Sequence, residues 1–129
     1  MLAEPYSFTM TMATDIPRWE ADQQKARMVA DLFAARAHAH FGSRLKRLTL
    51  FGSTVRGEWM PDSDVDILIT LDRVSDDDRD WIVSRSFSIG VLDHEVLIQP
   101  VILAEAEFQH LLDRERQFAL EVVRTGVNL

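Results

Sequence analysis

The sequence predicts an α+β fold, an α/β sandwich in which helices cover a small mixed β-sheet. Two observations lead to this class: the expected elements run helix, strand, turn, strand, helix, strand, helix, helix, and the strands are few. The 129 residues suffice for one compact domain. We expect that domain to span residues 17–129, after a flexible N-terminal tail over residues 1–16 that has neither a helical nor a strand period.

A long amphipathic helix is expected first, beginning near Pro17, because proline suits the first turn of a helix, and ending near Gly42. Its apolar residues recur mostly at spacings of three and four: Trp19, Ala26, Val29, Ala30, Phe33, Ala37 and Phe41. A short strand over 48–51 follows and ends at the Gly-Ser pair, after which residues 54–58 can form a helical turn. The clearest strand in the chain is the apolar run 65–71.

The second half of the chain continues with a helix over about 76–91. It begins at a block of acidic residues, Asp76 to Asp78 and Asp80, which suits a helix N-terminus and is expected to be solvated. A third strand over 95–103 contains Pro100, which places it at an edge of the sheet or at a bulge. Two helices, about 104–112 and 114–125, end the chain.

Composition excludes several classes of function. No apolar run approaches the ~18 residues of a membrane helix, and the N-terminus lacks the basic and apolar regions of a secretory signal. The chain has no cysteine, so neither disulfides nor a thiolate zinc site can form. A net charge of −7 argues against broad nucleic-acid binding. These features predict a cytoplasmic protein without membrane association, although a small basic pocket for one nucleotide remains compatible with them.

Two aspartates lie where an apolar strand begins. Asp64 and Asp66 are two positions apart, so they point to one face, with Cα atoms roughly 6.6 Å apart. Val65 and Ile67 point to the other face and anchor the strand in the core. Two carboxylates at this spacing can bind one or two hard cations, and oxygen ligands favour Mg²⁺ or Mn²⁺. Asp62, by contrast, belongs to a turn signal, Pro61-Asp62-Ser63.

A Gly-Ser pair follows the preceding strand. Gly52 can adopt backbone angles that other residues resist and lets a phosphate approach the backbone closely. Ser53 supplies a hydroxyl at the start of the helical turn, where free N–H groups favour an anion. Arg56, three residues further on, can reach the same phosphate. Together, the phosphate-binding turn and the carboxylates predict a nucleoside-triphosphate site.

The stretch 50–69, LFGSTVRGEWMPDSDVDILI, resembles the signature of the DNA polymerase β-like nucleotidyltransferase superfamily. Gly52-Ser53, ten intervening residues and Asp64-Val65-Asp66 carry the resemblance, and the flanking residues are similar to the minimal nucleotidyltransferase subgroup. The resemblance implies the polymerase β-like fold and Mg²⁺-dependent transfer of AMP from ATP to a hydroxyl, with release of pyrophosphate. It also implies a small helical partner of the HEPN family, for which such proteins act as antitoxins and which they can adenylylate.

Three functions are weighed on this basis. The first is an enzyme that transfers AMP to a hydroxyl of a protein, most simply a HEPN toxin. The second is a catalytically weak antitoxin that masks its partner by binding, with Trp59 and Met60 as candidate contacts. The third is transfer to a small molecule, for which a chain of this size offers little enclosing surface. The sequence is compatible with both a homo-oligomer and a hetero-oligomer.

Members of the superfamily often place a third carboxylate on a neighbouring strand, as metal ligand or base. The resemblance therefore directs attention to Glu95, and next to Asp93, at the start of the third expected strand. Gln99 lies deeper in that strand, where a ligand might otherwise be sought, but a Gln side chain cannot act as a base. His94 is a further candidate base. We predict Glu95 as the third catalytic residue beside Asp64 and Asp66.

Overall fold

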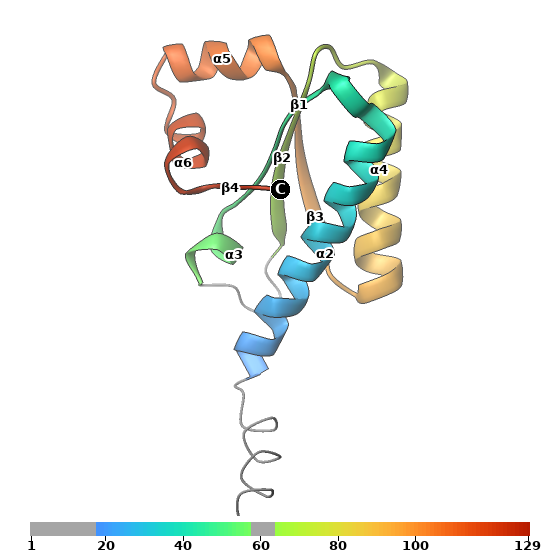
Figure 1. Ribbon diagram of the computed structural model, residues 1–129. Coiled ribbons are helices and arrows are strands. Elements are labelled where there is room, and N and C mark those ends of the chain that lie inside the picture. Colours follow the sequence, from blue (N-terminus) through green and yellow to red (C-terminus); the bar gives the residue numbers. More distant parts are fainter. Residues whose placement is uncertain (1–17, 58–63) are drawn as a thin grey trace, which may run out of the picture.

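The structure is a computed structural model that describes residues 18–57 and 64–129. It has an α+β fold in which helices lie on both faces of a four-stranded mixed sheet (Figure 1). The elements are, in order, α2 (Arg18–Phe41), the short helix η1 (Gly42–Arg44), β1 (Leu45–Phe51), α3 (Ser53–Arg56), β2 (Val65–Leu71), α4 (Asp76–Ser86), the π-helix η2 (Phe87–Leu92), β3 (Ile98–Ala104), α5 (Glu105–Asp113), α6 (Gln117–Thr125) and β4 (Val127–Asn128).

The strand order in the sheet is β3-β2-β1-β4. Strand β2 pairs antiparallel with β1 and parallel with β3. The last residues of β1 and the first residues of β2 and β3 therefore lie next to one another, at the same end of the strands. At this end of the strands, Asp66 lies between Phe51 on β1 and Gln99 on β3. Strand β3 is an outer strand, as Pro100 predicts, because proline cannot donate to a second neighbour.

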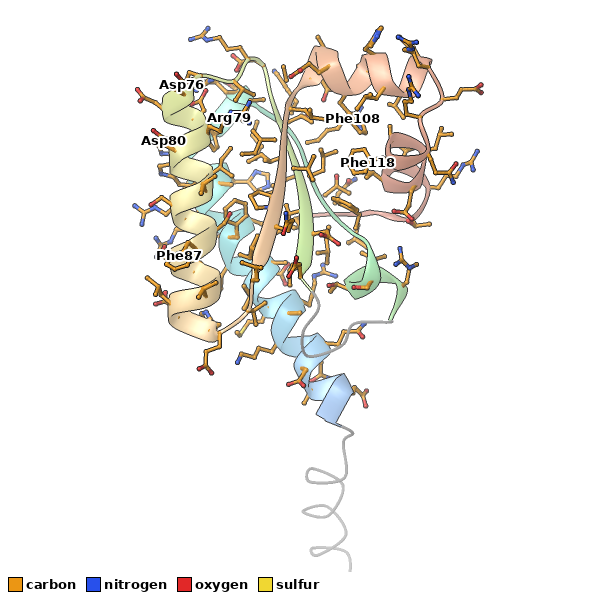
Figure 2. All side chains as sticks on the ribbon, turned by 180° about the vertical axis from the view of Figure 1, so that it is seen from behind. Asp76, Arg79, Asp80, Phe87, Phe108 and Phe118 are labelled. Atoms are coloured by element: carbon orange, nitrogen blue, oxygen red, sulfur yellow. The ribbon has the colours of Figure 1, made fainter. Side chains whose placement is uncertain are left out.

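The sheet separates two apolar cores. Helices α2 and α4 cover one face, and α5 and α6 cover the other (Figure 1). The odd-numbered residues of β2, from Val65 to Leu71, are fully buried in the core that also contains residues of α2. Leu68, which points the opposite way, packs in the second core with residues of α5 and α6. Figure 2 shows Phe108 and Phe118 between these two helices and the sheet.

Several element boundaries differ from the sequence prediction. Strand β1 begins at Leu45, three residues before the expected start, and β3 begins at Ile98 rather than at Glu95. Glu95 has a left-handed backbone (φ 56°), which lies outside the β region and interrupts a regular strand. The two-residue strand β4, paired with Thr49 and Leu50, was not predicted because a segment so short has no period.

The acidic block at the start of α4 is only partly solvated, so that interpretation was wrong for one residue. Asp76 and Asp80 are exposed, and Figure 2 shows them on the outer side of the helix, whereas Asp78 is buried. Asp78 forms a capping box with Ser75 and accepts two hydrogen bonds from Arg44, at 2.7 and 3.0 Å. The Arg44 guanidinium holds the pKa of this carboxyl well below its usual range, against the opposing effect of burial.

Replacing Asp78 with asparagine is expected to lower the free energy of unfolding at pH 7 by about 2 kcal/mol, because charge-assisted hydrogen bonds and a helix cap are lost. A depressed pKa stabilises the fold above the unfolded carboxyl pKa of about 3.9, and this contribution is lost as the pH falls through the folded pKa. In urea unfolding at a series of pH values, the difference between wild type and Asp78→Asn should therefore be constant from pH 7 down to about pH 4 and should shrink steadily at lower pH, as the unfolded carboxyl becomes protonated. A difference that did not shrink at all between about pH 4 and pH 2 would contradict the electrostatic assignment.

Candidate functional site

The two aspartates of the motif lie where the sequence pattern places them relative to the sheet. Asp64 directly precedes β2 and Asp66 is its second residue, and both are partly buried. Val65 and Ile67 between and after them are fully buried against the α2 side. Because side chains alternate along a strand, Asp66 shares a face with Leu68, which packs beneath α5 and α6. We call Asp64 and Asp66 the carboxylate pair.

The surroundings of the carboxylate pair disfavour negative charge on Asp66. Burial raises the pKa of Asp66, and the nearby charge of Asp64 raises it further. The Arg56 guanidinium acts in the opposite direction, while the charge of Glu121 adds to the increase. The charges that act on Asp66 are therefore mostly negative. Oxygen donors with surplus negative charge are a chemical fit for a hard divalent cation such as Mg²⁺.

The glycine-serine turn, Gly52 to Gly57, begins directly against Asp66. Gly52 has φ 82° and ψ −152°, a conformation that is essentially restricted to glycine. A methyl group added to it would overlap Asp66 Oδ2 and would stand 3.3 Å from Asp66 Cγ. The Gly52 carbonyl accepts hydrogen bonds from Val55 and Arg56, both at 3.2 Å, which closes the single turn of α3. The phosphate-binding turn and the cation ligands expected from the sequence are thus neighbours in space.

Arg56 extends from the end of α3 toward helix α6. Its Nη1 atom lies 3.4 Å from Oε1 of Glu121, and each of the two side chains is 41% exposed. Sequence reasoning did not single out Glu121. It is 55 residues beyond Asp66, and its own segment carries no motif. Only the packing of α6 over this face of the sheet could have identified it.

The predicted third catalytic residue, Glu95, lies in the loop between η2 and β3 and is exposed. Asp93 is also exposed, and His94 places its Nδ1 atom 2.8 Å from the carbonyl oxygen of Ile89. Gln99 is the residue of β3 that pairs with Asp66. Over residues 18–57 and 64–129, no three His, Asp or Glu side chains lie close enough to hold a metal ion together. The role of Glu95 stays a prediction.

Three residues of the motif stretch, Trp59, Met60 and Asp62, lie outside the described residues. Their expected roles, as partner contacts for the first two and as a turn former for Asp62, stay predictions.

A glycine-serine turn held against paired strand carboxylates, at one edge of a mixed sheet, points to the class of enzymes that transfer nucleotidyl groups. The family profile described as nucleotidyltransferase domain matches residues 36–123, well over half of the chain. The chain belongs to this family. The matched region includes the turn, the carboxylate pair, Glu95 and Glu121.

Two curated relatives come from Methanocaldococcus jannaschii. The chain is 34% identical over 68 residues to "Putative protein adenylyltransferase MJ0604", an alignment that covers 53% of this chain and 63% of the relative. It is 29% identical over 79 residues to "Putative protein adenylyltransferase MJ0141", covering 61% of this chain and 80% of the relative. The chain thus spans less than two thirds of the first relative. Within the described part of the chain, no helix is both long and apolar enough to cross a membrane.

Proposed function

We propose that this protein transfers AMP from ATP to a hydroxyl group of a protein acceptor, with Mg²⁺ as cofactor. The observation that carries the proposal is the fit of Gly52 against Asp66, because a turn suited to phosphate and a carboxylate suited to a cation then lie side by side. Membership in the nucleotidyltransferase family supports the reaction class. The names of the two archaeal relatives support a protein as the acceptor and an adenylyl group as the group that is transferred.

The residues have distinct roles in this reaction. Asp64 and Asp66 would hold Mg²⁺, which neutralises phosphate charge and orients the reacting oxygens when bound. Gly52, Ser53 and Arg56 bind the triphosphate through backbone N–H groups, a hydroxyl and a guanidinium. The acceptor oxygen forms a bond to the α-phosphorus as the bond to the pyrophosphate oxygen breaks, and the hydroxyl proton passes to a base. Glu95 is our candidate for that base. Catalysis then rests mainly on positioning and charge neutralisation.

The acceptor that we favour is a HEPN-family toxin, because the motif stretch 50–69 resembles antitoxins of such pairs. The protein would then neutralise its partner by adenylylation. A second candidate function is neutralisation by binding alone. The observation that favours it is the composition of β3, where the residue paired with Asp66 is Gln99 and not a carboxylate. Against it stands the carboxylate pair itself, since a protein that only binds has no evident need for two partly buried acids.

Co-expression with a HEPN protein encoded beside this chain tests both candidates. We expect the purified partner to carry one or several AMP-sized mass increments, measured by intact-mass spectrometry, and to acquire them in vitro from ATP and Mg²⁺. A partner that binds tightly but keeps its unmodified mass under those conditions would favour masking. If this protein transferred label from α-labelled ATP to a small molecule and not to the partner, the choice of a protein acceptor would be overturned.

A further inference from the structure

Arg56 is the last residue of the short helix α3. Helix α3 has a single turn of four residues, and it lies between two glycines with positive φ, Gly52 (82°) and Gly57 (75°). An arginine side chain carries about 2 kcal/mol of rotamer entropy. A guanidinium that must meet phosphates in one orientation therefore benefits from each contact that a rigid part of the fold makes with it.

Helix α6 supplies a rigid neighbour. Ala119 and Val122 are buried in the second core, and Phe118 contacts Phe51 edge-on, with ring centroids 5.3 Å apart. Since Phe51 is the last residue of β1, α6 is fixed to the strand that leads directly into the glycine-serine turn. Glu121 lies on this anchored helix and faces Arg56, with 3.4 Å between Nη1 and Oε1.

We propose that Glu121 is a positioning residue of the site, which holds the Arg56 guanidinium in place beside the carboxylate pair for contact with the triphosphate; this inference rests on the proposed function. Considered only as a negative charge, Glu121 would weaken the binding of ATP. A further anion near Asp64 and Asp66 repels a triphosphate, so simple electrostatics predicts that its removal improves ATP binding. Positioning predicts the reverse, and the sign of the effect therefore separates the two roles.

The variant Glu121→Gln removes the charge and keeps the shape. We expect the KM for ATP to rise about threefold, the value of one surface ion pair, while kcat changes by less than about twofold. Asp31→Asn is the matched control. It removes an ion pair of similar length and exposure, Arg27–Asp31 at 3.3 Å, from the middle of α2. The control should leave KM unchanged, and a fall in the KM of Glu121→Gln would overturn the proposal.

A double-mutant cycle tests whether Glu121 acts through Arg56. In an Arg56→Gln background, Glu121→Gln should not raise the KM further, because the side chain that it positions is gone. Equal effects of Glu121→Gln in the two backgrounds would assign Glu121 an independent role, for instance as a metal ligand or base, and would overturn the positioning assignment.

The motion of the Arg56 side chain can be measured without any activity, which separates this inference from the proposed function. In protein labelled with ¹⁵N-arginine, the heteronuclear NOE of Arg56 Nε reports motion on the picosecond-to-nanosecond scale. We expect a lower NOE in Glu121→Gln than in wild type and in Asp31→Asn. An Arg56 side chain equally ordered in all three proteins would refute the restraint, even if wild type proved to be an active transferase. A wild type without transfer or ATP binding would refute the proposed function and leave this measurement valid.

Discussion

The double variant Asp64→Asn/Asp66→Asn is expected to lose AMP transfer by at least roughly 10³-fold. Both carboxylates would bind the same cation, and an amide oxygen carries no net charge to replace them. The measurement is incorporation of α-labelled AMP into the acceptor with ATP and Mg²⁺. Because the two residues act as a unit, each single variant should lose nearly as much as the pair.

The same variant is expected to unfold at a denaturant concentration no lower than that of wild type. Burial and the charge of Asp64 raise the pKa of Asp66, so ionising this carboxyl costs the folded state free energy. For an acid with a raised pKa, the stabilisation is complete below the unfolded pKa and is lost as the pH rises through the folded pKa. At pH 7 an asparagine, which is always neutral, removes that cost. Retained transfer by the double variant would refute the assignment of the site. Unfolding of the double variant at a lower denaturant concentration than wild type would refute the electrostatic argument.

Elements with a strong local pattern could be predicted from the sequence. The strand 65–71 has the predicted bounds because only Asp66 and Thr70 interrupt its apolar residues, and Pro100 correctly places β3 at an edge. Features that depend on distant packing could not. The burial of Asp78 depends on Arg44, 34 residues earlier, and the sequence pattern of a helix start gives no sign of such a partner. The strand β4 forms only because β1 offers it a free edge.

The candidate site divides in the same way. The alternation of Asp64, Val65, Asp66 and Ile67 predicts which side chains face the core, and burial agrees. The contact of Gly52 with Asp66 brings the residue after β1 against a residue of β2. The sequence predicts this contact only indirectly, because both residues are expected to belong to one site. Glu121 comes from a helix that carries no part of the motif. The resemblance directed attention to Glu95 as the third carboxylate, and it assigned no role to any single residue of helix α6.

Gly52→Ala is expected to reduce transfer by about 10²-fold, since a 1 Å displacement of a reacting group costs about that much. The new methyl group would overlap Asp66 Oδ2, so Asp66 must turn away from its position beside Asp64. The backbone of Gly52, at φ 82° and ψ −152°, is also unfavourable for alanine and should cost about 1–3 kcal/mol of folding free energy. Transfer assays and urea unfolding measure the two effects separately.

Gly42→Ala provides the control for backbone strain. Gly42 also has a positive φ, 56°, but a methyl group there meets no atom within 4 Å. It should therefore lower stability by about 1 kcal/mol without loss of transfer at a temperature where both variants are folded. If Gly52→Ala were equally active under those conditions, the close fit of the turn against Asp66 would have no part in catalysis. If only Gly52→Ala lost activity at a temperature where both variants are folded, the loss would follow from the displaced carboxylate and not from unfolding.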